Sequence, residues 1–248
     1  MADVPFSWRL LAPIEADGTW QMAIDRWLLA RAVAGDHRPV LRFYRWSRPT
    51  LSLGHHQHDL DPRWLDLQAG NAMAIVRRPS GGSAVLHAGD LTYALIWPQA
   101  PTSRRESYRI ASRWLMDGFQ ALGLSLSFGT DPARGSSSHC FSTSTAADLV
   151  ETGGNKRVGS AQLWRRGCLL QHGSVLIDPP STLWTRVFGS APPTLAPLPA
   201  AVRHWRDLAA HLTASAAGSL PGRIGTPLEP MVLSAADWER IRAERQDP

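Results

Sequence analysis

The chain has 248 residues, of which 44% are hydrophobic and 19% charged. This balance is typical of a globular protein and excludes a disordered or collagen-like chain. Two cysteines, Cys140 and Cys168, are too few for a disulfide framework. There is neither a signal-peptide pattern at the N-terminus nor an apolar run of about 18 residues, the length that would span a membrane. We therefore expect a cytoplasmic protein.

The basic residues are almost all of one kind. They comprise 25 arginines and a single lysine, Lys156, and the net charge is +5. Arginine is a planar cation that stays protonated, whereas lysine is a compact ammonium whose charge its surroundings can tune. Because the other basic residues are all arginines, the single lysine is a candidate for a specific functional role. The net charge suits an acidic partner, either nucleic acid or an acidic carrier protein.

The N-terminal half alternates between helical and strand patterns. Residues 17–33 carry large apolar side chains at helical spacing, and Gly35 follows as a stop. Apolar and polar residues then alternate in VLRFYRW and TLSLG, and again in AMAIVRR and AVLHAGDLTYALIW, with the glycine turn PSGGS between the last two. These patterns predict four or five strands.

The middle of the chain predicts a helix, a loop and a meander. The helix is expected from about Ser107 to Leu122, and a loop rich in Gly, Ser and Thr from Phe128 to Thr145. Three segments then predict consecutive antiparallel strands: Ala147–Glu151, Lys156–Trp164 and Gly167–Ile177. The turn GGN between the first two is a favoured hairpin type.

The C-terminal part predicts an extended segment and two helices. Six prolines between Asp178 and Ala200 indicate a stretch without regular structure. Helices are expected over Ala201–Ala216 and from Ser234, where Asp237 completes a capping box. No clean linker divides the chain. We expect one α+β domain over 1–248, with a core at about 20–220 and a short helical extension at 221–248.

The glycine-rich turn is the first candidate site. VRRPSGGSAVLH places two arginines before a Ser-Gly-Gly turn and a histidine after it. Glycines let the backbone approach a ligand, and their N–H groups can hold an oxyanion or a phosphate. No Gly-Lys-Ser/Thr follows, so this is not a P-loop, and no helix opens behind it, so it is not a dinucleotide fingerprint. A plain hairpin turn is the alternative.

Two groups of histidines are candidates for a metal site. His55, His56 and His58 lie close in sequence, but neighbouring residues of an extended chain point to opposite faces, which favours a solvated loop. A zinc site from His139, Cys140, Cys168 and His172 fits no compact finger spacing. We therefore expect no metal.

Cys140 and Lys156 are the pair of residues that points most specifically to catalysis. One predicted strand and the GGN turn separate them, and because a hairpin brings its ends together, the two residues can be neighbours. A nearby cation stabilises a thiolate over a thiol, and an exposed, cation-paired cysteine is typical of a nucleophile. A structural loop cysteine is the alternative. Cys168 falls in the apolar strand GCLLQHGSVLI and is expected to pack as a small hydrophobic residue.

Four stretches together resemble the biotin/lipoate protein ligase superfamily, and within it the lipoate ligases and octanoyltransferases. They are WQMAIDRWLL, FYRWSRPTLSLGHHQ, RRPSGGSAVLHAGDLTYALI and KRVGSAQLWRRGCLLQHGSVLID, in the family's order. Four ordered motifs are far more specific than one. The resemblance implies the catalytic-domain fold of that superfamily, with mixed β-sheets and packed helices, which agrees with the strand pattern above.

The resemblance also implies a tunnel for an eight-carbon acyl chain. Its expected substrate-binding residues are Arg77, Arg78, Ser80, Gly81, Gly82, His87, Gly159, Ser160, Ala161, His172 and Gly173. The family's invariant lysine falls on Lys156, which accounts for the one lysine that this chain retains. The family's third turn glycine is replaced by Ser83.

Two subfamilies differ in the loop before the lysine hairpin. Cysteine-dependent octanoyltransferases carry Cys-Phe there, as Cys140-Phe141 does here, whereas ATP-dependent ligases usually carry an Arg-Asn or Asn-Asp pair. Many ligases also carry an accessory domain, for which we expect too few residues after the core motifs. Both features favour the transferase.

We therefore expect an octanoyltransferase with Cys140 and Lys156 as its catalytic residues. Octanoyl-acyl carrier protein would donate the acyl group through a cysteine thioester. A lysine of a lipoyl-accepting protein, such as the glycine cleavage H protein or a 2-oxoacid dehydrogenase E2, would accept it. No cofactor, nucleic acid or membrane is expected to take part. The alternatives are an ATP-dependent lipoate ligase, in which Arg77, Arg78 and Lys156 would bind an acyl-adenylate, and a non-catalytic acyl or nucleic-acid binding module.

Overall fold

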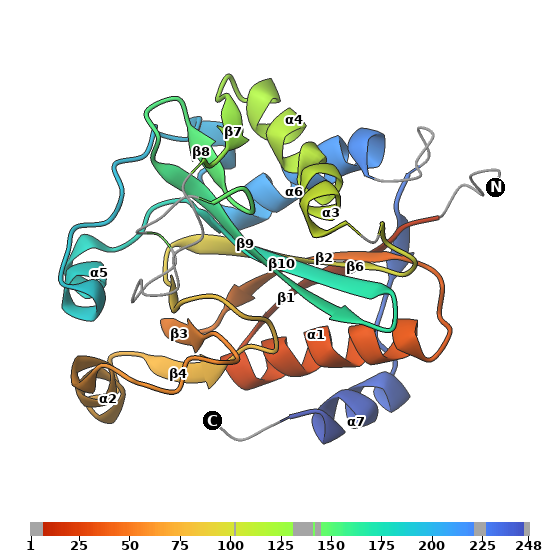
Figure 1. The fold of residues 1–248 in the computed structure, drawn as a ribbon, viewed down its shortest axis with the longest axis horizontal. Helices are drawn as coiled ribbons and strands as arrows, with labels where there is room; N and C mark the ends of the chain where they lie inside the picture. The colour runs from red at the N-terminus through yellow and green to blue at the C-terminus, as the bar shows by residue number, and fades with distance from the viewer. Residues whose placement is uncertain (1–6, 102, 131–140, 142–144, 221–226, 246–248) are drawn as a thin grey trace.

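An eight-stranded mixed sheet forms the centre of the protein (Figure 1). The computed structural model describes residues 7–101, 103–130, 141, 145–220 and 227–245. The strand order is β11-β1-β2-β6-β10-β9-β8-β7. The strands are β1 (Arg9–Ala16), β2 (Val40–Trp46), β6 (Asp90–Trp97), β7 (Leu126–Phe128), β8 (Leu149–Glu151), β9 (Lys156–Arg165), β10 (Cys168–Leu176) and β11 (Glu229–Met231). β1 pairs in parallel with β2 and β11, and the other pairs are antiparallel. The α+β class with mixed sheets is confirmed.

A second, three-stranded sheet lies beside the first. Its order is β4-β3-β5, with strands β4 (Ala74–Arg77), β3 (Thr50–Leu53) and β5 (Val85–His87). Two short helices, α2 (Pro62–Ala69) and α5 (Ser181–Phe188), bury Trp64 and Trp184 in the same apolar cluster as Leu51 of β3. This small sheet supplies one wall of the site described below.

Helices cover both faces of the large sheet (Figure 1). One face carries α3 (Arg104–Ala111), α4 (Arg113–Ala121) and α6 (Trp205–Ser219), and the other carries α1 (Gly18–Val33) and α7 (Ala235–Ala243). β6 shows why both faces are apolar: Leu91, Tyr93 and Leu95 join the α4–α6 cluster, whereas Ala94 and Ile96 join the α1 cluster. Side chains alternate between the faces of a strand, so each face of this central strand is buried.

Several predicted elements are confirmed together with the interactions that end them. α1 begins after Asp17, whose side chain accepts a hydrogen bond from the backbone N–H of Trp20. At α7, Ser234 and Asp237 make both hydrogen bonds of the predicted capping box. The predicted meander corresponds to β8, β9 and β10, which are consecutive antiparallel neighbours. Arg166 and Gly167, both with positive φ, make the tight turn between β9 and β10.

Three predictions of secondary structure are wrong in detail. The single helix expected over Ser107–Leu122 is two helices, broken at Ser112, whose hydroxyl accepts a hydrogen bond from Gln171 of β10. The stretch expected to lack regular structure contains α5, because none of its prolines falls within residues 181–188 and Trp184 and Val187 supply a buried face. The helix expected from Ala201 begins at Trp205, after a 3₁₀ turn over Ala200–Val202.

The C-terminal residues of the described chain pack against its first elements. β11 pairs with β1, and α7 lies along α1, where the Trp20 and Trp238 rings meet edge to face with centroids 5.7 Å apart. The guanidinium of Arg26 donates to the backbone carbonyl of Glu244. Within the described residues, no helix is both long and apolar enough to cross a membrane.

Candidate active site

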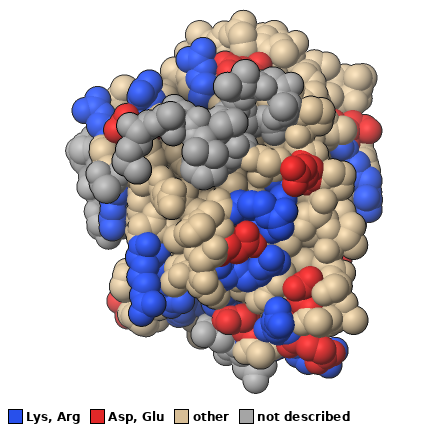
Figure 2. All heavy atoms as spheres, turned by 90° about the vertical axis from the view of Figure 1, so that its right-hand side faces the viewer, with Lys and Arg blue, Asp and Glu red and all other residues tan. Residues whose placement is uncertain are grey.

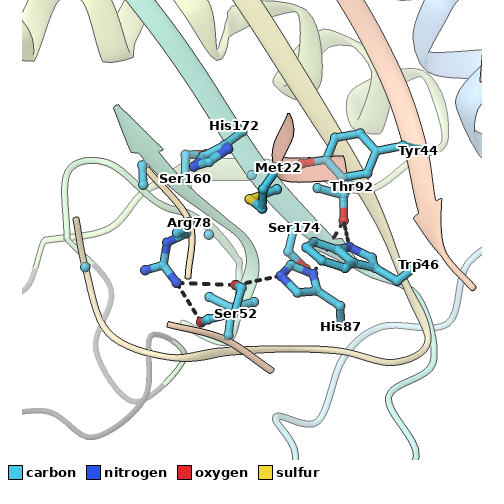
Figure 3. Close-up of a pocket in the computed structure, with 15 residues that line it drawn as sticks. Met22, Tyr44, Trp46, Ser52, Arg78, His87, Thr92, Ser160, His172 and Ser174 are labelled. Atoms are coloured by element: carbon cyan, nitrogen blue, oxygen red, sulfur yellow. Dashed lines mark hydrogen bonds between the residues drawn. The ribbon is translucent and has the colours of Figure 1, made fainter. Parts of the chain in front are cut away.

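A cavity of about 60 Å³ lies on the α1 face of the large sheet, against the small sheet (Figure 3). A cavity needs about 10–15 Å³ to hold one water, so this is a narrow slot rather than an open cleft. Met22 of α1, Tyr44 and Trp46 of β2 and Thr92 of β6 line it from the large-sheet side, and Val85 of β5 from the small sheet. The slot is mainly apolar, with a few polar groups aimed into it, as in many small-molecule sites.

The structure brings eight of the residues expected to bind substrate to this cavity. They are Arg78, Gly82, His87, Gly159, Ser160, Ala161, His172 and Gly173. The pairing of β9 with β10 explains part of this set, since Ala161 lies opposite His172 and Ser160 opposite Gly173. Arg77, Ser80, Gly81 and Lys156 do not line the cavity. Cys140 lies outside the described residues.

Arg78 holds the glycine turn in place. Its guanidinium donates to the backbone carbonyls of Gly81 at 2.9 Å, Ser83 at 2.7 Å and Ser52 at 2.7 Å, and its side chain is buried. Gly82 has a φ of +93°, a conformation that favours glycine. A Cβ at Gly54 would lie 1.8 Å from the Gly82 carbonyl oxygen, so the turn and the preceding loop touch backbone to backbone. The turn is therefore a rigid edge of the cavity.

Arg77 points to a different part of the molecule. Its guanidinium donates to the backbone carbonyls of Gly54 at 2.9 Å and Gln57 at 2.7 Å. Both arginines of the Arg-Arg pair thus have protein acceptors, and Lys156 has a carboxylate partner, described below. The three cations that a phosphate-binding site would use are already engaged within the protein.

His172 stands between a carboxylate and a hydroxyl. Its Nδ1 lies 2.9 Å from Asp25 of α1, and its Nε2 lies 2.5 Å from the hydroxyl of Ser80. A carboxylate only accepts hydrogen bonds, so Nδ1 carries the proton and Nε2 accepts from Ser80. The hydroxyl of Tyr44 donates to the same Asp25, and burial together with that carboxylate raises the pKa of Tyr44 well above its ordinary value.

His87 is the second histidine of the cavity. Its Nδ1 lies 2.8 Å from Asp90 and its Nε2 2.8 Å from the hydroxyl of Ser52. Its ring stacks on Trp46 with centroids 4.1 Å apart and an interplanar angle of 18°. Burial lowers the pKa of His87, and the opposing effect of the Asp90 carboxylate does not cancel this.

Lys156 forms a buried ion pair with Asp148. Its Nζ lies 2.9 Å from Asp148 Oδ1, and the two side chains are 2% and 4% exposed. The same oxygen accepts the backbone N–H of Ser160, which lines the cavity, at 3.4 Å. The ring of Phe141 lies 5.1 Å from the ammonium, within the range of a cation–π contact. Asp148 therefore connects the lysine to the cavity wall.

Tyr93 supports the same wall from behind. Its hydroxyl lies 2.9 Å from the Ser160 hydroxyl and accepts a hydrogen bond from Gln171. Burial raises the pKa of Tyr93 to about 12, so the phenol stays protonated at neutral pH. A Cβ at Gly173 would lie 2.6 Å from this ring, which explains why glycine occupies that position.

The other chemical candidates lie apart from this cluster. Cys168 is a buried free cysteine in the apolar cluster under α1, as predicted, and burial raises the pKa of its thiol. His55, His56 and His58 are exposed on the loop after β3. In the part of the chain that the structure describes, no three His, Cys, Asp or Glu side chains are grouped to hold a metal ion. His139 lies outside that part.

Sequence analysis missed four polar residues of this region: Ser52, Asp25, Asp90 and Asp148. Asp90 lies three residues after His87 in the sequence HAGD, and this spacing could have predicted the pair. Asp25 interrupts the apolar side of α1 and is completely buried, which is also a usable signal. Nothing local marks Asp148 or Ser52, because only the tertiary fold brings them to their partners.

Comparisons with known proteins find relatives of this chain. The family model described as "Lipoyl protein ligase A/B catalytic domain" matches residues 17–196. The octanoyltransferase LipM of Kyrpidia tusciae is 36% identical over 183 residues, and that of Symbiobacterium thermophilum is 39% identical over 181. Each alignment covers 69% of this chain and 66% of the relative, so the chain matches just under two thirds of the length of these relatives.

Solved structures share the fold at lower identity. A lipoate-protein ligase A bound with ATP superposes with a TM-score of 0.77 at 20% identity, covering 96% of this chain and 94% of that one. A bi-partite lipoate protein ligase of Thermoplasma acidophilum, studied with its E2 lipoyl domain, gives 0.72 at 18% identity, covering 96% and 91%.

Proposed function

Because this chain belongs to the family of lipoyl protein ligase A/B catalytic domains, we propose that it is an octanoyltransferase acting through a thioester on Cys140. The observation that carries the proposal is the name shared by relatives that are 36–39% identical, octanoyltransferase LipM. The donor is octanoyl-acyl carrier protein. The acceptor is a lysine of a lipoyl-accepting protein, such as the glycine cleavage H protein or a 2-oxoacid dehydrogenase E2.

The proposed reaction has two steps, each with a thioester as the electrophile. The Cys140 thiolate attacks the carbonyl of the carrier's thioester, a new C–S bond forms, and the carrier's own C–S bond breaks. The carrier leaves as a thiolate, which takes up a proton from water. The uncharged amine of the acceptor lysine then attacks this second thioester. An amide forms, the amine loses a proton, and the Cys140 thiolate is released.

Lys156 supplies the positive charge in this scheme. Two observations support its role: its ammonium is buried with Asp148, and it contacts the ring of Phe141, the residue that follows Cys140 in the sequence. A buried cation acts strongly on nearby charge because little water screens it. We assign to Lys156 the stabilisation of the thiolate and the orientation of the acyl carbonyl.

The cavity takes the octanoyl chain in this proposal. Met22, Trp46 and Val85 offer apolar walls for this chain. Backbone N–H groups of the glycine turn and of residues 159–161 are the candidates for holding the developing oxyanion, since preorganised donors stabilise it best. We propose no cofactor or metal.

The charge of the protein supports an acidic donor. The net charge is +5, and Figure 2 shows one face on which groups of basic side chains reach the surface with acidic groups among them. Acyl carrier protein is acidic as a family, so opposite charges would favour the encounter. We propose neither nucleic acid nor membrane as a partner, and a cytoplasmic location for a single domain over 1–248.

An ATP-dependent ligase is the alternative activity that the test must exclude. The solved ligases share about a fifth of their residues with this chain, a likeness that shows the fold alone. The test mixes the protein with octanoyl-acyl carrier protein in the absence of ATP and follows its intact mass. An octanoyl adduct mapped to Cys140, and lost when a lipoyl domain is added, is the expected result. Transfer that needs ATP and free octanoate, with no adduct, would overturn the proposal.

A further inference from the structure

Three side chains at the cavity form an arrangement that the proposed reaction does not use. Ser52 of β3, His87 of β5 and Asp90 of β6 lie in a row, with Ser52 Oγ 2.8 Å from His87 Nε2 and His87 Nδ1 2.8 Å from Asp90 Oδ2 (Figure 3 labels the first two). The three residues are 1%, 6% and 4% exposed. A nucleophile, a base and an orienting carboxylate within hydrogen-bond reach are the parts of a serine acyl-transfer site.

The neighbours of Asp90 and His87 fix the direction of the hydrogen bonds within this row. Asp90 Oδ2 also accepts hydrogen bonds from Ser174 at 2.7 Å and Thr92 at 3.2 Å, so the carboxylate is held as an acceptor. His87 Nδ1 must therefore donate, which leaves Nε2 to accept the proton of Ser52. The stacked Trp46 keeps the imidazole in this plane. The lowered pKa of His87 leaves the ring uncharged at neutral pH and able to take that proton.

Ser52 also has a cation beside it and the cavity in front of it. Arg78 Nη1 lies 3.3 Å from its hydroxyl oxygen, where positive charge stabilises an attacking or departing oxyanion. Ser52 and His87 both line the cavity. The second row of this kind, Ser80–His172–Asp25, differs in this respect, because its serine does not line the cavity. Of these two rows, the Ser52 row is the one whose serine lines the slot.

We propose that Ser52 is a second acyl-accepting nucleophile, which gives this protein a hydrolytic activity on medium-chain acyl esters that does not need Cys140. In the first step, Ser52 Oγ bonds to the acyl carbonyl, the hydroxyl proton passes to His87 Nε2, and the ester C–O bond breaks as the alcohol leaves with that proton. Water then attacks the acyl-serine, His87 takes its proton and returns it to Ser52, and the carboxylic acid is released. The inference rests on the proposed function only in taking the cavity as the site of the acyl chain.

The test uses the full chain carrying Cys140→Ala, so that residue 140 offers no nucleophile. An alkyl fluorophosphonate with an eight-carbon chain is the probe, since a serine next to a base displaces its fluoride and forms a stable bond to phosphorus. Peptide mapping should place the adduct on Ser52. In the same background, hydrolysis of p-nitrophenyl octanoate should fall at least about 100-fold on adding Ser52→Ala or His87→Gln, the scale of a lost base.

Ser107→Ala is the matched control, because Ser107 is a buried serine away from the cavity, and its hydroxyl bonds the Arg104 carbonyl and Gln162 rather than a histidine. The adduct on Ser52 should persist in that variant. An adduct on any other serine, or none on Ser52, would overturn the inference, and this map needs no variant at Ser52 to fold. Octanoyl transfer by the wild-type protein is measured separately, so failure of the proposed function and failure of this inference are distinguishable.

Discussion

Lys156 Nζ and Asp148 Oδ1 lie 2.9 Å apart, and both side chains are almost wholly buried. The second oxygen of Asp148 accepts hydrogen bonds from the backbone N–H and the hydroxyl of Thr145. One carboxylate thus fixes the segment that leads into β8 and at the same time holds the ammonium of the only lysine in the chain. The position of that lysine is set by this partner rather than by β9 alone.

Replacing Asp148 by alanine should leave a buried ammonium without its carboxylate. Removal of one partner of a buried ion pair typically costs about 3–5 kcal/mol, so the free energy of unfolding from urea titrations should fall by about that amount. The double variant Asp148→Leu with Lys156→Met removes both charges and should recover part of the loss. A double variant that is no more stable than Asp148→Ala would show that the ion pair is not the cause.

The two cysteines should differ sharply in function. Cys140→Ser should abolish transfer, because a hydroxyl is a far poorer nucleophile than a thiolate. Cys168→Ser should keep most of the activity and lower stability by about 1–3 kcal/mol through a buried hydroxyl. Transfer of radiolabelled octanoate from the carrier measures the first effect, and urea denaturation the second. Activity lost in the Cys168 variant but retained in the Cys140 variant would reverse the assignment.

Substitutions of Lys156 test whether it activates Cys140. Lys156→Ala should slow alkylation of Cys140 at neutral pH and shift its pH profile upward, because the cation that stabilises the thiolate is gone. Lys156→Arg keeps the charge but not the compact shape, so alkylation should be largely preserved while transfer falls strongly in both variants. The measurement is iodoacetamide labelling of Cys140 against pH. Identical profiles in the three proteins would exclude this role.

Acid should destabilise the fold in part through His87. Burial lowers its pKa, so on acidification the unfolded chain takes up the proton first. The stability that the neutral ring contributes is therefore present above the unfolded value of about 6.5 and is lost as the pH falls from there toward the folded value. Urea midpoints at about pH 7.5 and 5.5 should fall further in the wild type than in His87→Gln. Equal losses would contradict this account.

Salt should weaken the reaction mainly through association with the carrier. The protein has a net charge of +5, and exposed charges are screened beyond about 8 Å at physiological ionic strength. kcat/KM for octanoyl-acyl carrier protein should therefore fall with added sodium chloride while kcat changes little. p-Nitrophenyl octanoate, which is uncharged, is the control substrate. A kcat/KM that is flat from low to high salt would remove electrostatic docking from the proposal.

The elements that sequence analysis predicted best are those with local signals. α1 has an apolar face and a capping aspartate, and α7 has its capping box, so both could be found without knowing the rest of the fold. The break at Ser112 could not, because residues 107–122 keep a helical pattern across it and the hydrogen bond from Gln171 comes from a distant strand. α2, α5, the edge strands β7 and β11, and β1 beside β11 were missed because each is short or depends on a neighbour to bury it.

In the candidate site too, residues that belong to a sequence motif could be predicted, whereas residues without a local signal could not. Motif positions on the glycine turn, β5, β9 and β10 line one cavity. Their hydrogen-bond partners did not follow from the sequence. Asp25 reaches His172 from a helix near the start of the chain, and Asp148 reaches Lys156 across a bulged strand pair. Such partners are chosen by tertiary packing, which no short pattern encodes.

The pairing of β11 with β1 bears on how the protein is made. Glu229 lies opposite Arg9 at the edge of the large sheet, so the strand that covers this edge is the last strand of the described chain. While the protein is being synthesised, the outer backbone groups of β1 stay unpaired until β11 has left the ribosome. An open strand edge is a template for pairing with other chains, and contacts between such distant segments form late. The nascent chain therefore carries an open strand edge from the emergence of β1 to that of β11, and chaperones that cover exposed strand edges would act in that interval.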